Sequence, residues 1–337
     1  MKLNVWKSLK KTNGATLTSL ADLLQGREAG TAVRWGHLEM IPLFGSACAA
    51  GSFAPPQKSL RLTQVTNYGE MILENKGNLP TIVPLHLGYF QNAAQNHAMC
   101  VSALLAAGKS KQFKDACCIQ AAQGGYIEEA DERFIILPQP LRDKALALRG
   151  KEDYSKLWKD IAAFNRRLNL KNRGHLDELK RAHQPELLRT VYHLEPAPGQ
   201  TGAVFLCNNT VVGIELAPDT AFWNDLHTPL VMYCYAPLGL INDVEGTTPW
   251  TGETLVVEKL NSLDDLQSRW STLVARRQER VNQWMDKLQA LPILSSQVEQ
   301  QQGQNQLLTI EIEDFVGQMV LQDQKPAYVS LSRKSPR

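Results

Sequence analysis

The chain has 337 residues, of which 43% are hydrophobic and 21% are charged, and its formal net charge is +2. These values are ordinary for a globular protein, and the small net charge argues against duplex nucleic acid as the main partner. No apolar run approaches the roughly 20 residues that span a bilayer, and the N-terminus lacks the apolar core of a signal peptide. We therefore expect a cytoplasmic protein with no membrane partner.

The first 137 residues are predicted to form one short helix and then mostly strands. Thr16–Gly26 has apolar residues at three- and four-residue spacing, with Gly26 at a C-cap position. From residue 33 to about residue 137, Gly, Pro and Asn separate β-branched and alternating runs, which is typical of an antiparallel or mixed sheet. Ala103–Ser110 ends in Gly-Lys-Ser, but a strand is predicted to follow it. We therefore interpret it as a hairpin turn rather than a phosphate-binding loop.

The middle of the chain is predicted to be helical and basic. Asp153–Leu170 places Leu157, Ile161, Phe164 and Leu168 on one stripe, and a weaker helical pattern continues to about residue 191. From residue 142 to residue 189, thirteen Lys and Arg residues stand against seven Asp and Glu residues. The simplest interpretation is a solvated basic face, and the alternative is a surface that binds an anion or a partner.

Strands and one long helix are predicted for the last third. Gly202–Leu216 has a hairpin pattern with Asn208-Asn209 at the turn, and Pro229–Leu240 is predicted to be a strand. Leu263–Leu291 is the longest predicted helix, and Pro292 ends it. Residues 295–306 are predicted to be a polar loop, and the rest to form two or three strands that turn at Gln324–Pro326.

These patterns together predict an α+β fold, in which a β-rich mixed or antiparallel sheet body carries helices at 153–170 and 263–291. We expect residues 1–30 to be an N-terminal helical segment. Residues 31–332 are expected to form a single large domain with a helical insertion at about 142–192.

The stretch YFQNAAQNHAM, Tyr89–Met99, contains Gln-Asn twice, four residues apart, between two apolar runs. Amide side chains both donate and accept hydrogen bonds, so they suit an amide, a base edge or a ribose. An ordinary polar turn is the alternative. The six cysteines show no CxxC spacing, and we expect them to be reduced and buried. His175 and His183 lie eight residues apart, which is not the usual spacing of helical metal ligands, so we predict no metal and no cofactor.

The order of several segments resembles one known domain family. These segments are HLEMIPLFG, GEMILENKGNLPTIVPLHLGYFQNAAQNHAM, CIQAAQGGY, LWKDI and GAVFLCNNTVVGIELAP. The family is named for its association with ADP-ribosylglycohydrolases and rhodanese-phosphatase-type proteins. The resemblance covers roughly residues 33–240, and VGQMVLQDQKPAYVSLS resembles the family's closing hairpin.

This sequence has counterparts of two family motifs at similar positions, but most of the motifs' ionisable residues are replaced in it. In the first, KQNR, Gln95 and Asn96 match, whereas Ala94 replaces Lys and His97 replaces Arg. In the second, CVExGRW, Gly124 matches, and neutral residues replace the others at Gln120, Ala122, Gly125 and Tyr126. Because acid–base chemistry and phosphate clamping need titratable or charged groups, this member is expected not to perform chemistry based on those residues.

The resemblance implies an accessory or ligand-binding protein related to ADP-ribose, NAD or nucleotide metabolism. One alternative is a non-catalytic interaction subunit, whose protein partner binds residues 142–189 or the helix at 263–291. Another is a hydrolase that acts on a nucleotide or an ADP-ribosylated substrate, for example through His97 and the acidic cluster Glu128–Glu132. Whether the chain is an enzyme stays open. The predicted ligand-binding residues are Gln91, Asn92, Gln95, Asn96, His97, Gln123 and Gly124.

Overall fold

The computed structural model describes residues 17–46, 48–90, 96–120, 133–171, 175–251, 255, 260 and 262–335. Its largest sheet joins nine described strands, and every pairing in it is antiparallel. The order is β1 (Glu28–Ala29), β3 (Leu38–Phe44), β13 (Gln200–Cys207), β14 (Thr210–Leu216), β18 (Lys325–Arg333), β17 (Phe315–Gln322), β16 (Asn305–Ile312) and β15 (Ile293–Gln302), with β2 (Val33–Trp35) paired to β3.

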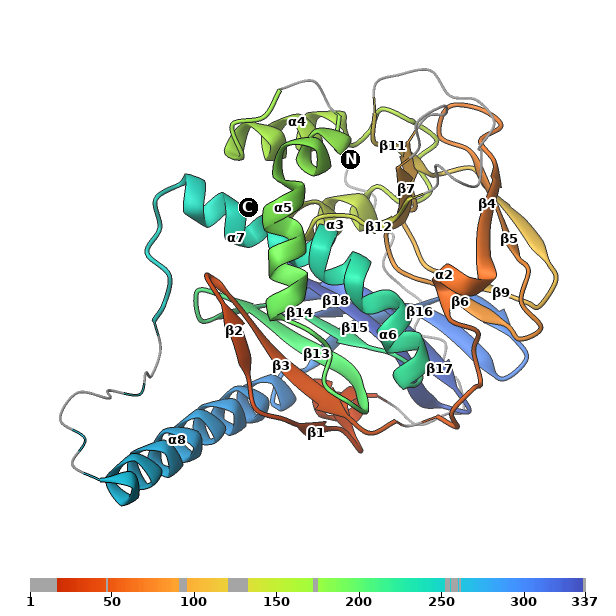
Figure 1. Cartoon of the computed structure of the whole chain (residues 1–337). Helices are drawn as coiled ribbons and strands as arrows, with labels where there is room; N and C mark the ends of the chain where they lie inside the picture. The colour runs from red at the N-terminus through yellow and green to blue at the C-terminus, as the bar shows by residue number, and fades with distance from the viewer. Residues whose placement is uncertain are drawn as a thin grey trace, which may run out of the picture.

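Smaller antiparallel sheets form a second region of the molecule (Figure 1). One contains β4 (Leu60–Gln64), β5 (Met71–Asn75) and β10 (Ser110–Phe113), and another pairs β6 (Thr81–Val83) with β9 (Ala103–Leu105). The third contains β7 (Leu87–Phe90), β8 (His97–Ala98), β11 (Cys117–Cys118) and β12 (Arg133–Ile136).

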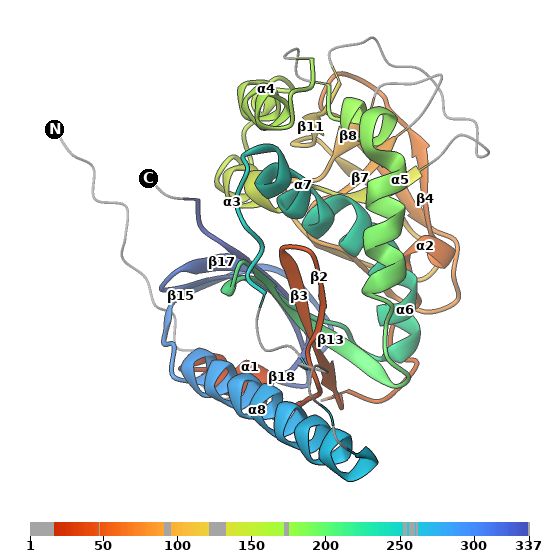
Figure 2. The ribbon, with the colours of Figure 1, turned by 60° about the vertical axis from the view of Figure 1, so that its left-hand side comes forward.

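Helices cover both faces of the large sheet (Figure 2). Against one face lie α1 (Leu20–Leu24) and α8 (Leu263–Gln289), whose buried side chains share a core with the strands. Against the other face lie α6 (Thr220–Pro229), a π-helix (Leu230–Tyr235) and α7 (Ala236–Val244), which continue into one another. On the same side, α3 (Gln139–Ala147) contacts β17 and β18, and α5 (Asp177–His193) contacts β2. Further from the sheet are α2 (Pro56–Ser59) and α4 (Trp158–Arg167). Among the described helices, none is both long and apolar enough to cross a membrane.

The predicted α+β class is confirmed, and local turn chemistry explains part of the agreement. Asn208 and Asn209 connect β13 to β14 with φ values of 45° and 59°, the left-handed pair that a two-residue hairpin turn requires. The helices α4 and α8 lie inside the predicted ranges 153–170 and 263–291. The division at residue 30 and the insertion at about 142–192 stay predictions.

Three local predictions are wrong. Pro229–Leu240 is helical rather than a strand. Residues 230–236 are all buried, and a short run of apolar residues shows no periodicity that distinguishes a buried helix from a buried strand. Residues 295–302 belong to β15 and residues 305–306 to β16, and only the two-residue turn at 303–304 separates them. Their polar side chains suit β15 because it is the edge strand of the sheet. The Gly-Lys-Ser turn is followed by β10 as predicted, but β9 and β10 pair with different strands and form no hairpin.

Candidate functional site

The described ends of the two motifs, Asn96-His97 and Gln120, lie close together at the third small sheet. His97 in β8 is the register partner of Tyr89 in β7 and of Cys118 in β11. The Ile119 N–H donates to the Asn96 carbonyl at 3.0 Å, beyond the end of the β8–β11 pairing. Strand pairing therefore brings together segments that are separate in the sequence.

Two of the seven predicted ligand-binding residues can be placed, and both are buried. Asn96 is 1% exposed and His97 is 0% exposed. The Gly69 N–H donates to His97 Nε2 at 3.3 Å, and the Asn96 N–H donates to the Gln120 side chain at 3.4 Å. The His97 contact is made by its side chain, whereas the Asn96 contact is made by its backbone, and a ligand role for either residue stays a prediction. The other five, like the acidic cluster 128–132, lie outside the described residues: Gln91, Asn92, Gln95, Gln123 and Gly124.

A second group of polar residues lines a hollow of about 150 Å³ between the large sheet and α8. Arg34 comes from β2, Glu39 from β3, and Trp250 from the segment after α7. Arg277 and Arg280 stand three residues apart on α8, which places them on the same side of the helix. Ala32 completes the lining.

Trp250 organises the guanidinium groups of this arginine hollow. The Arg280 guanidinium carbon lies 4.2 Å from the Trp250 ring centroid, and that of Arg34 lies 5.1 Å from it. Arg34 Nη1 also donates to the Trp250 carbonyl at 2.9 Å, and Nη2 donates to the Thr251 carbonyl. Arg280 is ion-paired with Glu39, whose side chain is 5% exposed. These cation–π contacts and hydrogen bonds hold the arginines around the hollow.

The arginine hollow carries excess positive charge, since three guanidinium groups face one carboxylate. Burial lowers the pKa of Arg34, and repulsion from Arg277 lowers it further. Burial likewise lowers the pKa of Arg280, with repulsion from Arg34 as the second cause. Arginines remain protonated at neutral pH, so an anion placed among them would relieve this repulsion. Chemically, the arrangement suits the binding of phosphate or carboxylate groups.

A larger hollow of about 480 Å³ lies where the loop after β3 meets the start of α6. Its main polar group, Asp219, is already used, because it accepts hydrogen bonds from the Phe222 and Gly51 N–H groups. Burial raises the pKa of the Cys48 thiol in this hollow, which disfavours the reactive thiolate. Within the described residues, no group of three or more His, Cys, Asp or Glu residues is arranged to hold a metal ion. The arginine hollow is therefore the stronger candidate.

No pattern in the sequence predicted the arginine hollow. Arg34 and Trp250 are 216 positions apart, and neither belongs to a motif. The only local signal is the spacing of Arg277 and Arg280 on a predicted helix, which is equally consistent with a solvated face.

The fold and the arginine hollow together define an α+β protein with a cationic recess on one side of its main sheet. The chain matches the ARG and Rhodanese-Phosphatase-superfamily-associated Protein domain over residues 26–313, and it belongs to this family. No curated protein and no solved structure matches the chain. The predicted resemblance is thus confirmed at the level of the family, whose description states an association with other proteins.

Proposed function

We propose that this chain is an accessory protein that binds a small phosphate-bearing molecule of the ADP-ribose, NAD or nucleotide type. The convergence of Arg34, Arg277 and Arg280 on one hollow carries the proposal. Each guanidinium presents a planar fork of donors that matches two phosphate oxygens. The family's association with ARG and rhodanese-phosphatase proteins supports the accessory part of the proposal.

The size of the arginine hollow limits which part of the ligand it would hold. Its volume of about 150 Å³ corresponds to roughly five water molecules in the liquid. That space suits phosphate groups, and the rest of a nucleotide would extend over the surface. Trp250 already contacts two guanidinium groups, so its role in this proposal is to position them.

The amide-rich segment 91–97, with Gln123 and Gly124, stays a predicted ligand contact. The neighbouring strands β7 and β11 lie well apart from α8 in both ribbon views (Figures 1 and 2), so we propose this contact as a site separate from the arginine hollow. The hydrolase alternative depends on His97, whose side chain is buried against Gly69. No observation on the described residues favours that alternative over binding.

Calorimetry with ADP-ribose, NAD and inorganic pyrophosphate tests the proposal. Arg277→Ala removes one charged donor and is expected to weaken binding by about 10- to 100-fold, because a hydrogen bond to a charged group contributes about 1.5–3 kcal/mol. Arg276→Ala is the matched control, since this exposed neighbour on α8 does not line the hollow. The proposal fails if the folded wild type binds none of these molecules, or if the two variants bind equally.

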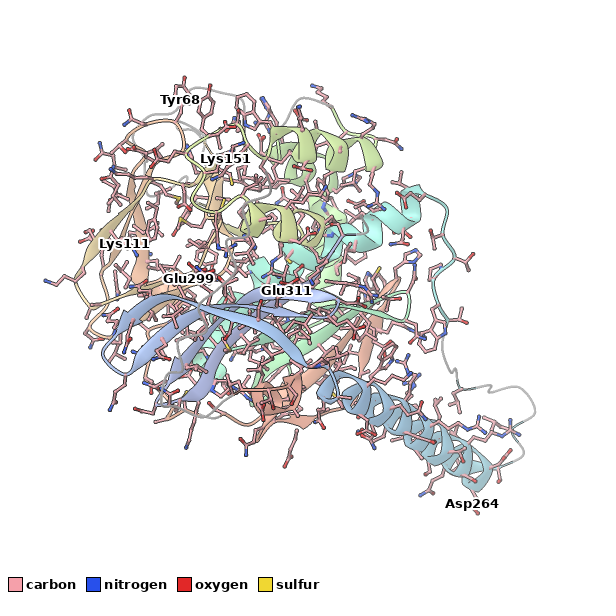
Figure 3. The ribbon with its side chains drawn as sticks, turned by 180° about the vertical axis from the view of Figure 1, so that it is seen from behind. Tyr68, Lys111, Lys151, Asp264, Glu299 and Glu311 are labelled. Atoms are coloured by element: carbon pink, nitrogen blue, oxygen red, sulfur yellow. The ribbon has the colours of Figure 1, made fainter. Side chains whose placement is uncertain are left out.

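One observation favours the interaction-subunit alternative as a second function. The half of α8 that leaves the body exposes an apolar stripe, in which Leu263 is 82%, Trp270 52% and Val274 38% exposed. Asp264 at its free end lies well away from the sheets (Figure 3). Val281, Met285 and Leu288 continue the same face into the core. An exposed apolar stripe of this kind is typical of a docking surface.

A second copy of this chain is the partner whose charges fit that stripe best. If two α8 helices pair antiparallel about Trp270, Asp264 at the acidic start of one helix lies level with Arg276 of the other, six residues beyond Trp270. Parallel pairing would instead oppose like charges.

Sedimentation over a range of protein concentrations tests this pairing. We expect the mass of two 37.6 kDa chains at high concentration. Trp270→Glu is expected to raise the dissociation constant at least tenfold, because buried tryptophans contribute strongly to interfaces. Ser268→Glu, on the opposite side of the helix by its spacing, should leave the dissociation constant unchanged. A single-chain mass at every concentration would exclude the pairing without affecting the ligand proposal.

A further inference from the structure

Two cysteines lie in contact where β8 pairs with β11. Cys117 in β11 is the register partner of Ala98 in β8, and Cys100 follows β8 by two residues. The Cys100 and Cys117 Sγ atoms are 2.9 Å apart, and both residues are 0% exposed. This separation is only about 0.9 Å more than the disulfide bond length of about 2.05 Å, so a small side-chain movement would allow the bond to form.

The surroundings distinguish this pair from the other buried thiols. Burial raises the pKa of Cys207 and of Cys234 to about 12. By contrast, the hydrogen bond from Cys117 lowers the pKa of Cys100 despite its burial, and the Lys156 ammonium adds to the effect. Cys100 is thus the thiol of the pair that more readily becomes the nucleophilic thiolate.

We propose that Cys100 and Cys117 form an oxidisable dithiol that hydrogen peroxide converts to a disulfide. In the first step the Cys100 thiolate attacks one peroxide oxygen, the O–O bond breaks, hydroxide leaves, and Cys100 becomes a sulfenic acid. In the second step the Cys117 sulfur attacks the Cys100 sulfur, the S–OH bond breaks, and water leaves with the proton of Cys117. Peroxide gains two electrons, and each sulfur loses one.

The bond would connect the segment that follows Gln95-Asn96 to the segment that precedes Gln120. It would close a loop between positions 17 apart, and so restrict separation of β8 from β11. The pair would therefore respond to oxidants by stabilising the pairing of β8 with β11, beside Asn96-His97 and Gln120. This inference is independent of ligand binding in the arginine hollow.

Peptide mapping of the wild-type chain tests the proposal. The native protein is treated with hydrogen peroxide, unfolded, alkylated and digested. The expected product joins the Cys100 and Cys117 peptides, with a mass loss of two hydrogens that dithiothreitol reverses. If the treatment oxidises the half-buried Cys48 while Cys100 and Cys117 are both alkylated as free thiols, the proposal is wrong.

Two cysteine variants distinguish a Cys100–Cys117 bond from one that involves the neighbouring Cys118. Cys100→Ser should abolish the joined peptide, whereas Cys118→Ser should retain it, because Cys118 directs its thiol to the Gln120 carbonyl. The oxidised wild type should melt roughly 5 °C higher than the reduced protein, because the closed loop restricts the unfolded chain. Loss of the joined peptide in Cys118→Ser, or an unchanged melting temperature, would contradict the proposed pairing or its structural effect.

Discussion

Arg142 in α3 and Glu215 in β14 form a buried ion pair, with Nη1 2.6 Å from Oε1 and neither side chain more than 2% exposed. The Tyr235 hydroxyl donates to the same carboxylate oxygen at 2.8 Å, and Arg142 Nη2 donates to the Ser330 hydroxyl. The first arginine of the predicted basic surface is therefore part of the interior. It links α3 to the large sheet, and the remainder of the region 142–189 stays a predicted partner surface.

Removing one member of this pair should destabilise the fold strongly. Arg142→Met leaves the Glu215 carboxylate buried without its cation, which is expected to cost about 3–5 kcal/mol of unfolding free energy. Arg167→Met is the matched control at the exposed pair with Glu245, where the side chains are 48% and 42% exposed, and should cost less than about 1 kcal/mol. Urea unfolding measures the free energy of unfolding of both variants. Equal losses of this free energy would show that the buried ion pair contributes no more to stability than the surface pair.

Two glycines should respond in opposite directions to a single added methyl group. A Cβ on Gly213 would overlap the Tyr235 hydroxyl that donates to Glu215, so Gly213→Ala should cost about 1–3 kcal/mol. On Gly239 in α7, the nearest atom would be an ordinary 3.7 Å away. Gly239→Ala should therefore gain up to about 1 kcal/mol from helix propensity. Thermal unfolding of the two variants shows whether each substitution raises or lowers stability. Stabilisation by both substitutions would contradict the close contact at Gly213.

Burial of His227 should make the fold sensitive to mild acid. Burial lowers the pKa of His227 from 6.5 to about 4. The unfolded chain then binds a proton at a pH where the folded chain does not, so stability is complete above pH 6.5 and falls as the pH drops toward 4. Between about pH 7 and pH 5 the expected loss from this residue is about 2 kcal/mol.

Urea unfolding at several pH values checks this dependence. His227→Gln should show a shallower loss of stability than the wild type between about pH 7 and pH 5, because it lacks this proton uptake. Part of the slope should remain, since burial also lowers the pKa of His86 well below its usual value. Above pH 7 the free energy of unfolding should vary with pH to the same extent in the wild type and in His227→Gln. Parallel slopes across the acidic range would mean that His227 is not buried as a neutral imidazole.

The regular elements were predictable where neighbouring residues carry the information. Asn208-Asn209 forms the β13–β14 turn because both residues tolerate positive φ, and α8 follows from apolar residues at helical spacing. The same approach was wrong for Pro229–Leu240, where burial on every side removes the periodic pattern. It was also wrong for residues 295–306, where an edge strand accepts polar side chains.

The sequence by itself determined the α+β class, the main hairpin, the long helix and the family to which the chain belongs. Tertiary structure decided where charge and sulfur gather. Arg34, Trp250 and Arg277 meet only because β2, the segment after α7, and α8 pack together. Cys100 meets Cys117 only because β8 pairs with β11. Turn geometry and helical spacing act between residues close in sequence, whereas these contacts depend on which strands and helices become neighbours in the folded chain.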